Sequence, residues 1–419
     1  MKISKEILNN GATLVLAPVE GVKSTSIFYF IKSGSRKENE KNNGIAHFIE
    51  HMMFKGTTKR PTALDISQEI DSIGAYFNAF TDRENTAYYV KTAGEHLGKA
   101  LDVLSDMVLS STFDGSEIEK EKGVIVEEIR MYKDNPSWHI GDIYESLIYQ
   151  NSTLGLPIAG EENTVTSFNR QTFLDFYGAN YGAENIILIL VGNLENEKGK
   201  AKEFLNKFRA GTGTRENNPV PLQEKPRLIL ERRDVQQGQF HLGVPGYSFT
   251  HPDKFSLRLM SIILGGNMSS RLFSEVREKR GLAYSIHTTT EGLSDTGHVT
   301  TLAGVERSKI YDALKLILEE YQRIGDDATE EELQRAKDYY KGSFVISLED
   351  TSRIATFLAS QIFYQGDALS IEEILEKIEE VKLGDVKRVS KDIFKKEKLN
   401  LAVIGPYENR EKFDKILEI

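Results

Sequence analysis

Residues 185–193 read NIILILVGN, and this stretch decides the fold class. A short continuous apolar run that stops at glycine is typical of a fully buried strand. The next stretch, residues 197–208, reads EKGKAKEFLNKF, and its apolar residues recur at helical spacing. Residues 399–419, LNLAVIGPYENREKFDKILEI, repeat the same order of buried strand and helix. The two copies lie about 210 residues apart, which indicates an internal duplication.

A second pair of segments supports the duplication. The segment from Gly74, GAYFNAFTDRENTAYYVKTAGEHLGKALDVLSDM, and the segment from Leu282, LAYSIHTTTEGLSDTGHVTTLAGVERSKIYDALKLILEE, both read as two strands followed by an amphipathic helix. Between the halves, residues 209–226 are rich in Gly, Thr, Asn and Pro, which is typical of a linker. We therefore expect two homologous domains, residues 1–208 and 227–419, joined by a linker at 209–226.

The first half mixes strands and helices without strict alternation. Residues 6–17 predict a hairpin around Asn10-Gly11, and residues 25–32 predict an alternating strand. Helical patterns follow at 44–55, 62–73, 95–111 and 116–134. This order favours the α+β class over a doubly wound parallel sheet. We expect each domain to be a largely antiparallel mixed sheet with helices packed on it.

Composition excludes several classes of protein. The 419 residues include no cysteine, which rules out disulfides and thiol-based metal sites. Lys and Arg number 53 against 63 Asp and Glu, and the net charge of −10 argues against a nucleic-acid partner. The longest apolar run, residues 186–191, is too short to span a membrane, and the first residues do not resemble a signal peptide. We expect a cytoplasmic protein without a membrane partner.

Residues 43–54, NGIAHFIEHMMF, place a polar cluster on an otherwise apolar helix. His47, Glu50 and His51 fall within an arc of about 100°. Burial of two imidazoles beside a carboxylate is costly unless a partner satisfies them, and histidines at i and i+4 suit one zinc ion. The order H-x-x-E-H inverts the H-E-x-x-H of other zinc peptidases, in which the Glu is the general base. A hydrogen-bonded core cluster without metal is the alternative.

A zinc site on this helix needs a third ligand from His, Asp or Glu elsewhere in the chain. The helical pattern over 116–134 offers Glu121 and Glu128, which share one stripe with Ile125 and Tyr132. Other glutamates crowd the same helix, and a solvated acidic face is the commoner explanation of such a pattern.

The motif HFIEH at 47–51 is followed, after residues 52–127, by Glu128. With this spacing the whole chain resembles the pitrilysin-type zinc peptidases, and most closely their mitochondrial-processing-peptidase-like branch. The resemblance implies that His47, His51 and Glu128 bind one zinc ion per chain and that Glu50 is the general base. It also implies that Glu121 supports the site as a conserved acidic residue outside the ligand set.

The resemblance extends to further residues. In VREKRGLAYS, residues 276–285, Arg277 and Tyr284 stand at the spacing of the family's Arg and Tyr that reach the zinc site. The strand at 75–80, AYFNAF, resembles the family's exposed edge strand, so Asn78, Ala79 and Phe80 are the expected substrate-binding residues.

The implied function is that of a zinc-dependent endopeptidase acting on unfolded or small peptides, with a zinc-activated water as nucleophile. Residues 1–208 would be the catalytic domain, and residues 227–419 a degenerate copy that completes a substrate chamber in a two-domain clamshell. In that copy Leu257, Met260 and Ser261 take the places of His47, Glu50 and His51. The resemblance also implies a homodimer. The alternatives are a non-catalytic scaffold subunit of the same fold and a peptide-binding clamp with structural zinc.

Overall fold

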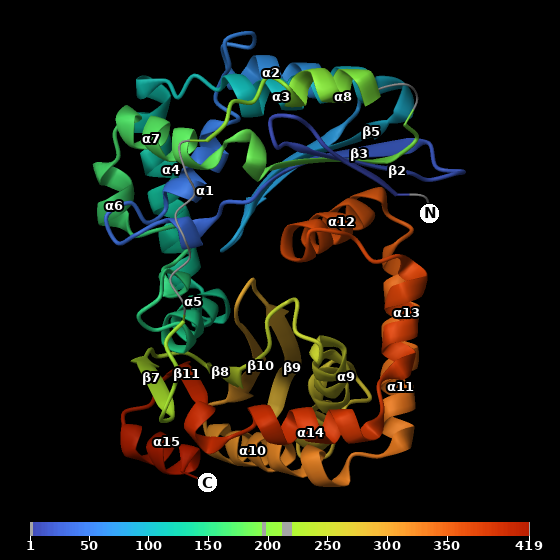
Figure 1. The fold of residues 1–419 in the computed structure, drawn as a ribbon. Helices are drawn as coiled ribbons and strands as arrows, with labels where there is room; N and C mark the ends of the chain where they lie inside the picture. Colours follow the sequence, from blue (N-terminus) through green and yellow to red (C-terminus); the bar gives the residue numbers. More distant parts are fainter. Residues whose placement is uncertain (1–2, 195–197, 212–219, 419) are drawn as a thin grey trace. The chain divides into compact units, whose positions relative to one another are not determined.

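A computed structural model describes residues 3–194, 198–211 and 220–418. Contacts divide the chain into two compact units. The first comprises residues 1–131, 156–218 and 346–368, and the second comprises residues 132–155, 219–345 and 369–419. Each unit contains one sheet with helices on both of its faces (Figure 1).

The first sheet has the order β1-β2-β6-β3-β5-β4. Its strands are β1 (Ser4–Ile7), β2 (Thr13–Pro18), β3 (Ser24–Ile31), β4 (Tyr76–Thr81), β5 (Thr86–Ala93) and β6 (Ile186–Gly192). Only the β2–β6 pair is parallel among the described pairs. The predicted hairpin is confirmed as β1–β2, and Gly11 has the positive φ of +93° that its turn requires.

Helices cover both faces of this sheet, with α12 alone on one side of it in Figure 1. They are α1 (Ile45–Met52), α2 (Ala63–Asp71), α3 (Leu97–Ser110), α4 (Gly115–Asp134), α6 (Glu162–Ser167), α7 (Arg170–Asn180), α8 (Lys198–Leu205) and α12 (Thr351–Gln365). The four predicted helices of the first half are confirmed as α1–α4. Because both faces are covered, β6 is apolar throughout: Leu188 joins the core around α1, whereas Ile189 packs with α12.

The second sheet has the order β7-β11-β8-β10-β9. Its strands are β7 (Arg227–Arg232), β8 (Gln237–Pro245), β9 (Ala283–Gly292), β10 (Gly297–Glu306) and β11 (Asn400–Gly405). Strand for strand, this order and its directions match β2-β6-β3-β5-β4, including one parallel pair at the start. The expected α+β class, with two homologous mixed sheets, is confirmed.

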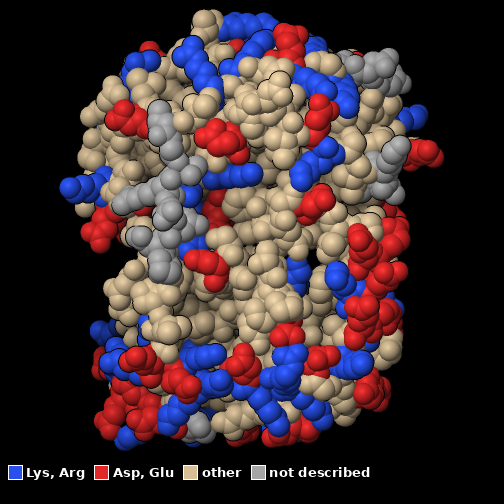
Figure 2. Space-filling view, in the orientation of Figure 1, with Lys and Arg blue, Asp and Glu red and all other residues tan. Residues whose placement is uncertain are grey.

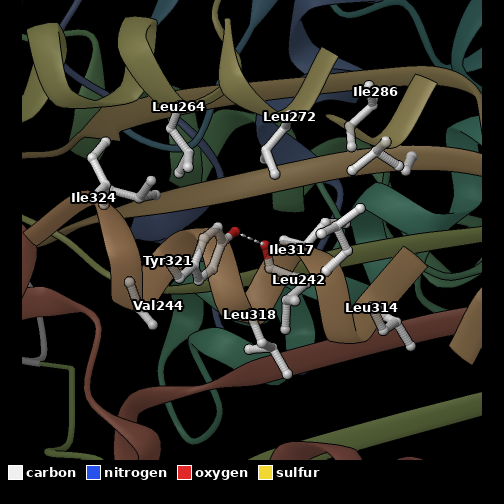
Figure 3. Packing of buried hydrophobic residues seen from close by; sticks show 14 of the residues in the cluster. Leu242, Val244, Leu264, Leu272, Ile286, Leu314, Ile317, Leu318, Tyr321 and Ile324 are labelled. Carbon is white, nitrogen blue, oxygen red and sulfur yellow. Dashed lines mark hydrogen bonds between the residues drawn. The ribbon is translucent and has the colours of Figure 1, made fainter. Parts of the chain in front are cut away.

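The helices of the second unit are α5 (Pro136–Ile148), α9 (Lys254–Gly265), α10 (Ile310–Asp327), α11 (Glu330–Ser347), α13 (Ile371–Glu380), α14 (Leu383–Ile393) and α15 (Arg410–Leu417). Figure 3 shows part of the core on one face of the sheet, where Leu242, Leu264 and Ile317 converge from β8, α9 and α10. Tyr321 lies in the same core, and its buried hydroxyl hydrogen-bonds to Thr301 Oγ1 at 2.7 Å.

Each unit takes one helix from the other half of the sequence. Helix α5 packs on β7, β8 and β11, and α12 packs on β3 and β6. The hydroxyl of Ser26 on β3 hydrogen-bonds to that of Thr351 at the start of α12 (2.7 Å). The boundaries 1–208, 209–226 and 227–419 stay a prediction, and residues 212–219 of the expected linker lie outside the described residues.

In the described part of the chain, every helix is too short or too polar to cross a bilayer. On the face drawn in Figure 2, Lys and Arg side chains stand among Asp and Glu side chains over α10, α14 and α15. Ion pairs on α10 and α14 include Lys391–Asp326 and Arg388–Asp385.

Candidate metal centre

Helix α1 is anchored in the core of the first unit. Ile45, Phe48, Ile49 and Met52 on this helix are each at most 1% exposed, so burial fixes how the helix is rotated. The remaining side, which carries His47, Glu50 and His51, is only partly buried. The local sequence therefore presents these three polar groups together.

Helix α1 begins where Gly44 lies close to Gly160 of the segment before α6. Gly44 has φ +96°, and a Cβ there would lie 2.8 Å from the carbonyl oxygen of Ala159 and 2.9 Å from Cα of Gly160. A larger residue at either glycine would collide with backbone, since Gly160 approaches the carbonyl of Asn43 in the same way.

A buried carboxylate completes this entry. Glu38 is fully buried and accepts hydrogen bonds from the backbone N–H groups of Gly44 and Ala46, both at 2.8 Å. It also accepts from the Asn43 side chain at 2.9 Å. Burial raises the pKa of Glu38 to about 8, although these three donors favour its ionised form.

His47 and His51 of α1 meet Glu128 of α4. Glu128 Oε2 lies 3.9 Å from His47 Nε2 and 3.5 Å from His51 Nε2. One ligand atom from each residue lies within 4.8 Å of the other two. Among the described residues this is the only group of three or more acidic, His or Cys side chains that converges in this way.

The hydrogen bonding of His51 tests whether a cation fits. Its Nδ1 lies 2.8 Å from Glu121 Oε1, so in the neutral ring Nδ1 carries the hydrogen and Nε2 carries a lone pair. That lone pair and the carboxylate of Glu128 face each other, an arrangement that a cation between them stabilises. Tetrahedral zinc holds its ligand atoms roughly 3.3 Å apart, close to the separations found here. The donor set, two imidazoles and one carboxylate, is that of a catalytic zinc site with one open position.

Burial and the neighbouring polar groups set the protonation of the imidazoles. Burial, and then the neighbouring His51, lowers the pKa of His47 to about 3. Burial also opposes the charged form of His51, but its hydrogen bond to Glu121 and the charge of Glu128 outweigh burial and raise the pKa of His51. His47 is therefore neutral across the physiological range, whereas His51 takes up a proton more readily than an isolated imidazole.

Glu121 is held from two sides. Its Oε1 meets His51, and its Oε2 lies 2.6 Å from Nζ of Lys55. Burial raises the pKa of Glu121, but the hydrogen bonds to His51 and Lys55 outweigh it and lower the pKa. An ionised Glu121 fixes the tautomer and the ring orientation of His51, which is how carboxylates commonly support a metal-binding histidine.

Glu50 lies outside the candidate ligand set. Its Oε2 accepts a hydrogen bond from Thr81 Oγ1 at 2.5 Å. Burial raises the pKa of Glu50, and the hydrogen bond from Thr81 only partly opposes this. A carboxylate whose pKa is raised towards neutrality is suited to take and return a proton.

The chain matches known protein families over most of its length. Residues 15–162 match the family model described as Insulinase (Peptidase family M16), and residues 167–340 match the one described as Peptidase M16 inactive domain. A Bacillus subtilis relative named "Uncharacterized zinc protease YmxG" is 35% identical over 410 residues, covering 97% of this chain and 99% of the relative. The chain belongs to peptidase family M16. A further M16 relative, "Uncharacterized zinc protease SCO5738" of Streptomyces coelicolor, is 32% identical over 98% of this chain and 91% of the relative.

Solved structures share the M16 fold over the whole chain. A protease from Helicobacter pylori has a TM-score of 0.86 at 24% identity, covering 97% of this chain and 99% of that one. A chain of complex III2 from Candida albicans has a TM-score of 0.84 at 20% identity, covering 99% of this chain and all of the other. The expected zinc-peptidase family is confirmed, and the fold is shared with a chain of complex III2.

The second M16 domain lacks the polar cluster. Leu257, Met260 and Ser261 on α9, the residues aligned with His47, Glu50 and His51, are at most 3% exposed and lie among apolar neighbours. Ser261 donates only to the backbone carbonyl of Arg258 (2.8 Å) among the described residues. This helix therefore has a packing role, in keeping with the description of the matching model as an inactive domain.

The remaining expected site residues fall in two places. Asn78, Ala79 and Phe80 lie on β4, the edge strand of the first sheet. Arg277 and Tyr284 belong to the second unit, and the Arg277 guanidinium lies 5.9 Å from the centre of the Tyr284 ring. Tyr284 is 74% exposed.

Sequence reasoning missed three residues that support the centre: Glu38, Lys55 and Thr81. Thr81 lies one residue beyond the strand expected at 75–80, and the two-residue period of that strand places it on the same face as Ala79. No local pattern marks Glu38, whose partners are the backbone and the Asn43 side chain at the turn into α1, or Lys55, whose partner Glu121 lies on α4.

Proposed function

We propose that this M16 chain is a zinc-dependent endopeptidase that hydrolyses peptide bonds in unfolded or small peptides. The observation that carries the proposal is the convergence of His47, His51 and Glu128 beside Glu50. Glu50 is not one of the candidate metal ligands, so its carboxylate is left to transfer a proton. The expectation that the chain is an enzyme agrees with its zinc-protease relatives.

His47, His51 and Glu128 would hold one zinc ion. When bound, zinc supplies a Lewis acid that makes water acidic and polarises a peptide carbonyl. Glu50 takes the proton of the attacking water on a carboxylate oxygen and returns it to the leaving amine. Glu121 keeps Nε2 of His51 directed at the site through its hydrogen bond to Nδ1.

The edge strand β4 is the proposed site for the peptide. It pairs only with β5 among the described strands, so its other edge can accept an extended chain. The backbone N–H of Ala79 donates to the side-chain oxygen of Asn78 at 2.8 Å, and a substrate carbonyl would replace that acceptor. Main-chain pairing of this kind tolerates many sequences but requires an extended, unfolded substrate.

Further predictions belong to the same proposal. Arg277 and Tyr284 would steady the substrate and the developing oxyanion, by charge and by hydrogen bonding. Homodimer formation and a cytoplasmic location are also retained as predictions. A single species of 47.3 kDa in sedimentation experiments over a wide concentration range would reject the homodimer.

Digestion of one protein in two states tests the proposal. The zinc-loaded enzyme is incubated with a native globular protein and with the same protein denatured and alkylated, and products are followed by mass spectrometry. We expect cleavage of the denatured chain only, loss of cleavage with a chelator, and recovery when zinc is returned. Equal rates on both substrates would contradict the substrate class, and cleavage that survives chelation would contradict the dependence on zinc.

A further inference from the structure

Thr81 is the last residue of β4, and the pleat of the strand directs its side chain towards α1. Phe77 and Ala79, at two-residue spacing before it, pack against the core that contains α1. Phe80, on the opposite face, packs against the core that contains α12. Alternation along the strand thus brings the Thr81 hydroxyl to the polar side of α1, where it meets Glu50.

The contact joins a short donor to a flexible acceptor. Thr81 Oγ1 donates to Glu50 Oε2 at 2.5 Å, the distance of a strong hydrogen bond to a carboxylate. Within the described residues, Thr81 is the one hydrogen-bond partner of the Glu50 carboxylate. A glutamate side chain rotates about several bonds, and this one bond removes most of that freedom, because Thr is itself stiff at χ1.

We propose that Thr81 is a positioning residue, which holds Glu50 through Oε2 so that Oε1 is left to exchange the proton. The inference rests on the proposed function, because it takes Glu50 to be the general base. Thr81 also lies on the strand proposed to bind the peptide, three residues after Asn78. One strand would then set both the position of the peptide and the orientation of the base.

Isosteric substitutions separate this role from a structural one. Thr81→Val keeps the shape and the strand preference of the residue but removes the donor, whereas Thr81→Ser keeps the donor. We expect Thr81→Val to lower kcat by about tenfold to a hundredfold, since misplacement of a catalytic group has effects of this size. KM for an unfolded peptide and zinc content should stay at the wild-type values. Thr81→Ser should restore most of kcat.

Thr86 offers a matched control on the neighbouring strand. It is the partner of Thr81 in the β4–β5 ladder, and its hydroxyl donates to the carbonyl of Ser33 (2.9 Å), away from Glu50. Thr86→Val should therefore keep the wild-type kcat, whatever it does to stability. If Thr81→Val fails to fold, Thr81→Ala is the second donor-free variant, because it adds no atoms at the site, and the same loss of kcat is expected.

The outcomes distinguish this inference from the function on which it rests. If Glu50→Gln abolishes cleavage while Thr81→Val and Thr81→Ala retain the wild-type kcat, the positioning role is wrong and the proposed function stands. If Thr81→Val loses zinc, or changes only KM, the positioning role is also wrong. If Glu50→Gln turns over like the wild type, or the wild type cleaves no peptide, the proposed function fails and the positioning role fails with it.

Discussion

At the scale of single residues, His51 has a carboxylate at each of its ring nitrogens. Glu121 fixes Nδ1 at 2.8 Å, and Glu128 stands 3.5 Å from Nε2. The two carboxylates raise the pKa of His51, so a proton and a zinc ion compete for the same nitrogen. His47 adds no such competition near neutral pH, since its pKa is lowered to about 3.

This competition predicts how zinc affinity depends on pH. As pH falls through the raised pKa of His51, affinity should decrease by about tenfold per pH unit, because one proton must leave for each zinc ion bound. In the metal-free protein, low pH favours the folded state instead. The protonated His51 stabilises the fold at pH values below the ordinary histidine pKa, and this contribution is lost as pH rises through the raised pKa. Chelator competition between about pH 5 and 8 measures the first effect.

Glu121→Gln provides the control for the pH experiment. The amide still accepts a hydrogen bond but carries no charge, so the pKa of His51 should fall and the decline in zinc affinity should begin at lower pH. A zinc affinity that is constant across the range in the wild type would contradict the assignment of His51 as a ligand.

The third ligand can be tested on its own helix. Glu128→Gln replaces a charged ligand oxygen with a weaker amide oxygen. Zinc affinity should fall by at least about tenfold, since substitution of residues that only hydrogen-bond to metal ligands already lowers metal affinity by this factor. Glu127→Gln is the matched control, because Glu127 is exposed and pairs with Arg130 at the surface. Metal analysis of both variants after dialysis decides the matter; full zinc occupancy in Glu128→Gln would move the third ligand elsewhere.

At the scale of elements, helix α1 depends on how the chain enters it. Gly44→Ala would place a Cβ within 2.9 Å of backbone on the neighbouring segment and would strain φ +96°. We expect a lower denaturation midpoint, with a loss of about 2 kcal/mol or more, and lower zinc content as α1 shifts.

The same substitution elsewhere supplies the control for Gly44→Ala. Gly178 lies near the end of α7, and a Cβ there meets no atom within 4 Å. Gly178→Ala should therefore keep or slightly raise stability, since Ala is the better helix former. Equal midpoints and equal zinc contents for the two variants would show that the entry to α1 does not position the site.

The two helices that bear the site residues, α1 and α4, differ in how far sequence alone predicts their part in the site. In α1, His47, Glu50 and His51 are neighbours in one helical turn and a half, so helical period alone groups them. On α4, period places Glu121 and Glu128 on one face but does not separate them from the solvated glutamates. Glu117 and Glu119 prove to pair with lysines on the surface of that helix, which only the packed structure reveals.

At the scale of the whole molecule, the duplication was accessible from sequence because a buried strand followed by a helix recurs at the end of each half. The apolar runs at β6 and β11 are buried on both faces, and both sheets have the same order. The packing of α5 on the second sheet and of α12 on the first could not be predicted from sequence, since the pattern of an amphipathic helix does not specify which sheet the helix covers. The contact between Thr81 and Glu50 was missed for a similar reason, because it joins two elements that each look complete alone.

In the proposed function, an M16 zinc centre in the first unit performs hydrolysis with Glu50 as its base. The most direct measurement is the zinc content and the turnover of Glu50→Gln, purified in parallel with the wild type and assayed on a denatured protein by mass spectrometry. We expect wild-type zinc content with cleavage reduced by about a hundredfold or more. Turnover at the wild-type rate in a preparation free of other proteases would contradict it.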